Sequence, residues 1–154
     1  AFFRKSRMGF EFFEEGVEGF KNGVFRKDEK SEHPIHKTLA ELRGLEKKKY
    51  AESGNFRMFY VELIDITRMF LTQQYHIPAD VLLTDDLVEV MKHTNKISTE
   101  NEKVVEEIFL RGDLVKFAKI FPNQEMMNDD FKKIYDFVER STADIEAEQL
   151  RELH

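Results

Sequence analysis

The chain has 154 residues, no cysteine and no tryptophan, and its formal net charge is -6 at pH 7. A chain of this length predicts one domain with its own hydrophobic core. The lack of cysteine excludes disulfides, cysteine-ligated zinc and a cysteine nucleophile. The negative charge argues against a general nucleic-acid binder, because neutralising phosphates requires a basic face. Three prolines and seven glycines leave few helix breaks, which favours an all-α fold.

Aromatic and basic side chains stand together at the start of the chain. They are Phe2, Phe3, Arg4, Lys5 and Arg7. Apolar residues followed by positive charge are typical of the cytoplasmic exit of a transmembrane helix. The chain contains no run of about 18 apolar residues, so this pattern predicts a membrane anchor upstream of Ala1. The alternative is that these basic residues only solubilise the end of an excised fragment.

Residues 8–26 predict an amphipathic helix. Large apolar side chains recur at steps of three and four, at Phe10, Phe13, Val17, Phe20 and Val24. Four glycines in the segment each cost a helix about 1 kcal/mol relative to alanine. The helix therefore needs a surface, which could be the rest of the domain, a lipid interface or a second copy in a homo-oligomer. A polar connector follows, so we expect a segment at 1–33 and a domain at 34–150.

Two further helices are predicted before residue 80. Pro34 suits the first turn of one helix, and Ser-Gly-Asn at 53–55 ends it. The next helix is expected over 56–75. It ends before Ile77 and Pro78, because the residue before a proline is pushed out of the α region.

Capping patterns divide the remainder of the chain. Thr84 is expected to cap one helix, and Thr99 with Glu102 forms a capping-box pair for another. Gly112 is expected to end that second helix. Asp113 would cap a short helix that Pro122 follows, which explains the Arg-Gly-Asp tripeptide as a stop and a cap rather than an adhesion motif.

Asn123 opens the last predicted helix, which completes a single-domain bundle of six or seven helices. The predicted core consists of the large apolar residues on these helix stripes. They are Leu39, Leu42, Phe59, Leu63, Ile66, Phe70, Leu87, Val90, Val105, Ile108, Phe117, Phe121, Phe131, Ile134 and Val138.

Catalytic and metal-binding motifs are missing from the sequence. It has no glycine-rich phosphate loop, no nucleophile elbow and no HExxH pattern. His33 and His36 could share a metal, but a third ligand is not obvious nearby. We therefore expect no catalytic residue, no cofactor and no metal.

Charged residues among apolar ones form one further cluster. Arg57, Asp65 and Arg68 lie on the helix predicted at 56–75, and Lys116 lies between Val115 and Phe117. Long basic side chains usually extend to the surface, which is one interpretation. The alternative is that Arg68 pairs with a carboxylate of another helix inside the bundle and fixes helix register.

The same residues carry a resemblance. Residues 54–80, 83–92 and 112–122 resemble the helical cytoplasmic region of BatD-like proteins from the Bat aerotolerance operons of Bacteroidetes-type bacteria. The matching positions are Gly54, Arg57, Phe59, Tyr60, Leu63, Arg68, Thr84, Asp113, Val115, Lys116, Phe117 and Ala118. The opening of the family pattern departs here, because His36 stands about one residue out of register.

The resemblance implies a membrane-anchored protein whose helical domain lies on the cytoplasmic face of the bacterial inner membrane. It implies no catalytic activity, and its operon neighbours are a MoxR-type AAA+ ATPase and von Willebrand A (VWA) domain proteins. We therefore predict a non-enzymatic protein-interaction domain that works with these proteins in envelope stress or aerotolerance. The alternative is a stand-alone helical regulator that binds a small ligand or a nucleic acid. An enzyme ranks third.

Overall fold

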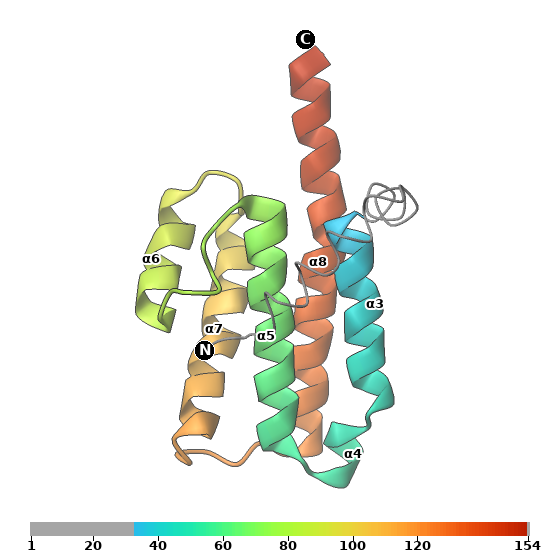
Figure 1. Ribbon diagram of the computed structural model, residues 1–154, viewed down its shortest axis with the longest axis vertical. Coiled ribbons are helices and arrows are strands. Elements are labelled where there is room, and N and C mark those ends of the chain that lie inside the picture. The colour runs from blue at the N-terminus through green and yellow to red at the C-terminus, as the bar shows by residue number, and fades with distance from the viewer. Residues whose placement is uncertain (1–32, 154) are drawn as a thin grey trace, which may run out of the picture. The chain divides into compact units, whose positions relative to one another are not determined.

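The computed structural model describes residues 33–153, with side chains described outside 143–149. The chain divides into two units, Ala1–His33 and Pro34–His154. The aromatic and basic residues at 2–7 and the helix predicted at 8–26 lie outside the described residues. Six helices and no strand form the described part (Figure 1), which confirms the all-α prediction. They are α3 (Pro34–Lys47), α4 (Tyr50–Ser53), α5 (Phe56–Tyr75), α6 (Thr84–His93), α7 (Thr99–Lys116) and α8 (Gln124–Leu153).

The long helices α3, α5, α7 and α8 run side by side (Figure 1). Helix α5 packs between α3 and α7, and α8 contacts all three. Helix α6 packs on α7, while the short α4 contacts α5 and α8 at one end of the bundle. No helix within residues 33–153 has both the length and the apolar character that crossing a bilayer requires.

Helix α5 has the predicted bounds. The side chain of Asn55 accepts a hydrogen bond from the Met58 N–H at 3.4 Å, and His76 ends the helix in the left-handed region with φ 59°. The preceding helix differs from the prediction. Lys49 also adopts a left-handed backbone, with φ 57°, and this break divides the single helix expected from Pro34 into α3 and α4.

Two predicted caps are shifted by one residue. Leu83 occupies the cap position of α6 with an extended backbone, so Thr84 is the first helical residue and not the cap. Ser98 caps α7, because its Oγ accepts a hydrogen bond from the Asn101 N–H at 3.1 Å. The capping box predicted from Thr99 is therefore wrong.

Helix α7 continues through Gly112, where two helices were expected. The glycine faces the bundle interior, and a Cβ atom there would overlap the Cδ1 atom of Ile64 on α5. Its small size thus serves close helix packing rather than a helix stop. Because the helix continues in phase, Ile108 and Val115 point inward and Phe117 is turned outward.

The predicted core is mostly correct, with three errors. Phe117, Phe121 and Val90 are exposed, at 65%, 70% and 36% of their surface. The exposure of Phe117 follows from the continuous phase of α7. Phe121 lies after that helix, and its ring meets the Phe56 ring in a T-shaped contact with centroids 5.9 Å apart. The other predicted core residues are buried or partly buried. They are Leu39, Leu42, Phe59, Leu63, Ile66, Phe70, Leu87, Val105, Ile108, Phe131, Ile134 and Val138.

A buried carboxylate joins three helices. Asp130 on α8 is fully buried and accepts hydrogen bonds from the Tyr60 hydroxyl at 2.5 Å and from Arg111 Nε and Nη2 at 2.7 and 2.8 Å. Burial and the bond to Asp130 raise the pKa of Tyr60 well above its usual range. The same carboxylate raises the pKa of Arg111 through their hydrogen bond. Tyr60 and Arg111 therefore both keep their protons.

We predict that Gly44→Ala stabilises the domain, whereas Gly112→Ala does not. No atom lies within 4 Å of a Cβ built at Gly44, so the change should add about 0.5–1 kcal/mol of helix propensity on α3. At Gly112 the overlap with Ile64 should cancel that gain. Urea unfolding of both variants checks this, and Ile64→Val, which removes Cδ1, should restore the gain at Gly112. Equal stabilisation by both alanines would contradict the packing role.

We predict that Asp130→Ala destabilises the domain by about 3–5 kcal/mol, because it leaves the Arg111 charge without its buried partner. Tyr60→Phe removes one hydrogen bond and should cost less, about 1–3 kcal/mol. The exposed neighbour Asp129 gives a matched control, since Asp129→Ala removes the same group from the surface. Chemical unfolding followed by circular dichroism measures all three variants. If Asp129→Ala and Asp130→Ala lower the free energy of unfolding equally, the buried triad of Tyr60, Arg111 and Asp130 does not hold the helices together.

Candidate functional site

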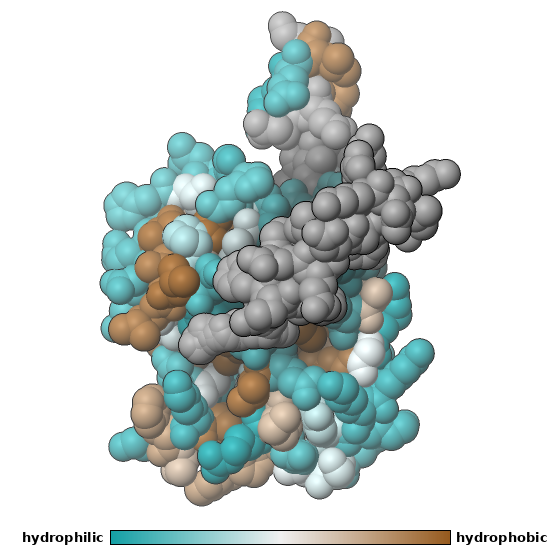
Figure 2. Space-filling model, in the orientation of Figure 1, coloured by the Kyte–Doolittle hydropathy of each residue, from teal (hydrophilic) through white to brown (hydrophobic). Residues whose placement is uncertain are grey.

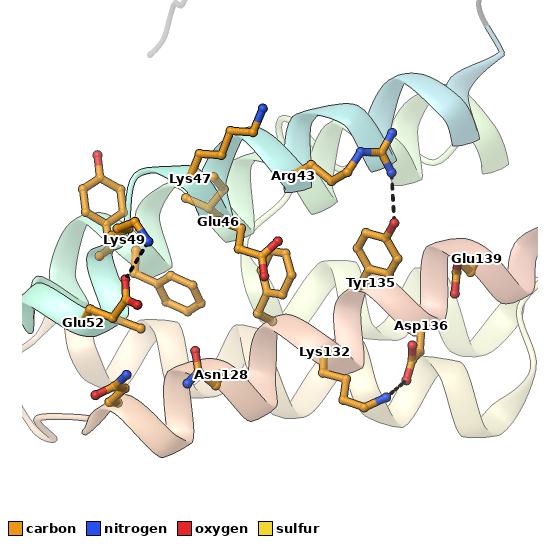
Figure 3. A pocket seen from close by; sticks show the side chains of 16 residues that line it. Arg43, Glu46, Lys47, Lys49, Glu52, Asn128, Lys132, Tyr135, Asp136 and Glu139 are labelled. Atoms are coloured by element: carbon orange, nitrogen blue, oxygen red, sulfur yellow. Dashed lines mark hydrogen bonds and ion pairs between the residues drawn. The ribbon is translucent and has the colours of Figure 1, made fainter.

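A groove of about 910 Å³ lies between α3–α4 and α8. Figure 3 shows side chains of both walls around it, with Arg43 and Glu46 from α3 and Lys132 and Tyr135 from α8. The break at Lys49 shapes the groove, because it ends α3 and redirects the chain into α4. The walls come from segments about 90 residues apart in sequence, as the hydrogen bond between Arg43 and Tyr135 illustrates (|i−j| = 92).

Aromatic side chains line the interior of the groove. They are Tyr50, Phe59, Phe131 and Tyr135. The Tyr50 hydroxyl donates a hydrogen bond to Glu62 at 2.8 Å, and Lys48 binds the other oxygen of the same carboxylate at 2.7 Å. The bond to Glu62 raises the pKa of Tyr50, so its hydroxyl stays protonated. Aromatic faces with polar tips are well suited to anchor part of a partner molecule.

Charges of both signs surround these aromatic rings. The basic residues are Arg43, Lys47, Lys49 and Lys132, and the acidic ones are Glu46, Glu52, Asp136 and Glu139. Several are paired locally (Figure 3). Arg43 donates to the Tyr135 hydroxyl at 3.0 Å, and Lys132 donates to Asp136 at 3.0 Å. A mixed rim of this kind can orient a peptide that carries both charges, whereas nucleic acid requires a contiguous positive face.

The residues singled out from the sequence do not converge on one site. Arg57 is exposed near the start of α5, and Thr84 is buried at the start of α6. Lys116 is exposed and lies over the ring of the neighbouring Phe117, 5.7 Å from its centroid. Tyr60 belongs to the buried triad. The groove lining includes none of the residues Arg57, Tyr60, Thr84, Lys116 and Phe117.

Arg68 is the predicted residue with the most informative surroundings. Its Nη1 donates hydrogen bonds to the carbonyls of Ala79 at 2.6 Å and Leu82 at 2.7 Å, and its guanidinium lies 5.0 Å from the centroid of the Phe109 ring. Burial lowers the pKa of Arg68, and the charge of Asp113 opposes that shift. Arg68 thus holds the α5–α6 loop through backbone carbonyls, rather than through the direct carboxylate pair that the sequence suggested.

The metal hypothesis gains no support from the described residues. His33 and His36 are exposed, and no three His, Cys, Asp or Glu side chains within 33–142 and 150–153 could jointly hold an ion. A site with ordinary zinc geometry would need three or four such ligands.

The sequence interpretation missed Asp130, Arg111 and the groove. Asp130 stands three residues after Met127 and four before Ile134, so it lies on the buried stripe of α8. An acidic residue in such a position is the pattern that could have revealed it. The groove left no comparable pattern, because its walls are far apart in sequence.

Comparisons with protein-family models, with curated proteins and with solved structures find no match for this chain.

One carboxylate lies outside both the triad and the groove. Glu102 on α7 is only 4% exposed, and its Oε2 atom has no hydrogen-bond partner among the described residues. Burial raises the pKa of Glu102, and the neighbouring Glu106 raises it further. Lys92 and Lys103 oppose this shift without reversing it.

We predict that Glu102→Gln makes the domain about 1 kcal/mol more stable at neutral pH, because it removes a buried charge without a full set of partners. The raised pKa means that the folded state holds the proton more tightly than the unfolded state. The wild type should therefore lose stability as pH rises from the ordinary glutamate value of 4.5 through the raised pKa. Below 4.5 the two proteins should be equally stable.

Unfolding measured across this pH range checks the prediction. Glu100→Gln, an exposed change in the first turn of the same helix, serves as the control and should show no such dependence. If Glu102→Gln is less stable than the wild type at neutral pH, Glu102 is not a buried charge that destabilises the fold.

Proposed function

We propose that this chain is a non-enzymatic protein-interaction domain that binds a segment of a partner protein in the groove between α3–α4 and α8. The observation that supports this proposal is the aromatic interior of the groove between rims of both charges. Buried aromatic anchors carry much of the affinity at protein interfaces, and complementary rim charges steer and orient the partner.

The resemblance to BatD-like proteins supports the choice of partners. In this proposal the domain lies on the cytoplasmic face of the bacterial inner membrane, tethered upstream of Ala1. There it works with a MoxR-type AAA+ ATPase and VWA-domain proteins in envelope stress or aerotolerance. Of the positions that carry the resemblance, only Phe59 lines the groove. The groove is therefore where this chain would select its own partner, while buried shared positions such as Tyr60 and Leu63 maintain the fold.

A second function is favoured by the size of the groove. Its volume lies within the range of about 300–1,000 Å³ that is typical of small-molecule sites. A stand-alone regulator would bind a small ligand there, with Tyr50 and Tyr135 against its apolar part. The protein-binding proposal is preferred, because four residues of each charge surround the groove and a small ligand would use few of them.

We predict that reversing two rim charges, Arg43→Glu with Lys132→Glu, weakens binding of the ATPase or VWA partner by about tenfold or more, since each lost complementary charge weakens association. Purified partner proteins and the full-length protein in membranes would be used in a quantified pull-down. The matched control reverses two exposed lysines outside the groove, Lys96→Glu with Lys119→Glu.

Equal capture of the partners by both double variants would count against the groove. Failure of the wild type to capture either protein would overturn the choice of partners. A small molecule that co-purifies with the wild type and is lost in the groove variant would favour the regulator.

A further inference from the structure

Hydrophobic surface gathers over α6 and the loop before it (Figure 2). Val81 and Leu83 in this loop are 74% and 76% exposed, and Val90 on α6 is 36% exposed. Asp86 and Val90 are four residues apart and share one face of α6, and Leu83 directly precedes this helix. None of these residues lines the groove.

The loop that carries these side chains has a fixed backbone. Arg68 donates hydrogen bonds to the carbonyls of Ala79 and Leu82, which lie on either side of Val81. The Val81 N–H also donates to the carbonyl of Pro78 at 3.3 Å, and Ala79 is fully buried. The exposed apolar groups are therefore pre-organised, which lowers the entropy cost of binding a partner.

Four exposed carboxylates neighbour these apolar residues in sequence, one in the loop and three on α6. They are Asp80, Asp85, Asp86 and Glu89. Glu89 lies 3.8 Å from His93, and the charge of Asp80 acts on Arg68, whereas Asp85 and Asp86 have no ion-pair partner among the described residues. Apolar side chains beside carboxylates complement a segment that presents apolar groups beside lysine or arginine. The same carboxylates disfavour an anionic lipid surface.

We propose that the surface formed by Val81, Leu83, Val90 and the four carboxylates is a second docking site, which binds a basic amphipathic segment of a partner protein. Apolar side chains of that segment contact Val81 and Leu83, and its basic side chains face Asp85 and Asp86. This site goes beyond the groove, because it uses other residues on other helices.

The test uses a fluorescent synthetic helix of leucine and lysine at amphipathic spacing, with fluorescence anisotropy as the readout. The wild-type chain should bind it, and high salt should weaken binding, since screening reduces interactions between exposed charges. The double variants Val81→Ser/Leu83→Ser and Asp85→Lys/Asp86→Lys should each weaken binding about tenfold or more. Leu114→Ser, which changes a half-exposed leucine of α7, should leave it unchanged.

Hydrogen exchange would locate the bound peptide, with protection expected over residues 78–90. Three results would overturn the proposal: no binding by the wild type, equal binding of a peptide with glutamate in place of lysine, or protection confined to the groove. The groove variant Arg43→Glu/Lys132→Glu should bind the peptide normally. The peptide experiment therefore tests this second site independently of the groove, which the pull-down tests.

Discussion

The buried carboxylate of Asp130 fixes how three helices meet. A charge without solvent is costly, so it is tolerated only where donors satisfy it from every side. Tyr60 on α5 and Arg111 on α7 provide those donors. A one-residue slip of α5 or α7 against α8 would break these bonds and leave a charge buried. We therefore expect the triad to select one register of these three helices.

Arg68 adds a second polar constraint on α5, eight residues after Tyr60. Its partly buried guanidinium binds the α5–α6 loop and lies over Phe109 of α7. Tyr60 and Arg68 therefore connect α5 to α7, to α8 and to this loop. Helix α3 is attached through buried apolar side chains, Ile35, Leu42 and Leu45, and takes part in neither of these polar clusters. Its described side-chain hydrogen bond to α8 is the exposed pair of Arg43 with Tyr135. We expect the groove side to adapt to a partner more readily than the α7 side, because exposed pairs contribute little stability.

Local patterns predicted much of the fold, and failures occurred where tertiary contacts decide. The bounds of α5 follow from Asn55 and from the stop before Pro78, which are local features. Gly112 is different, since a glycine can end a helix or permit close packing, and only the position of Ile64 decides between them. The wrong prediction that Phe117 belongs to the core follows from the wrong prediction that Gly112 ends a helix. The periodicity of α8 could have shown that Asp130 is buried, but not its partner Tyr60, 70 residues away, nor the groove walls, which the pair 92 residues apart joins.

The two proposed docking sites share no residue and use different helices. The groove is formed by α3, α4 and α8 with Phe59 of α5, whereas the second site is formed by α6 and the loop that Arg68 holds. A domain with two independent sites can hold two proteins together, and each then meets the other at a raised effective concentration. The aromatic groove with mixed charges and the acidic apolar surface would select different partners. If both proposed sites bind as described, the domain would link two partner proteins.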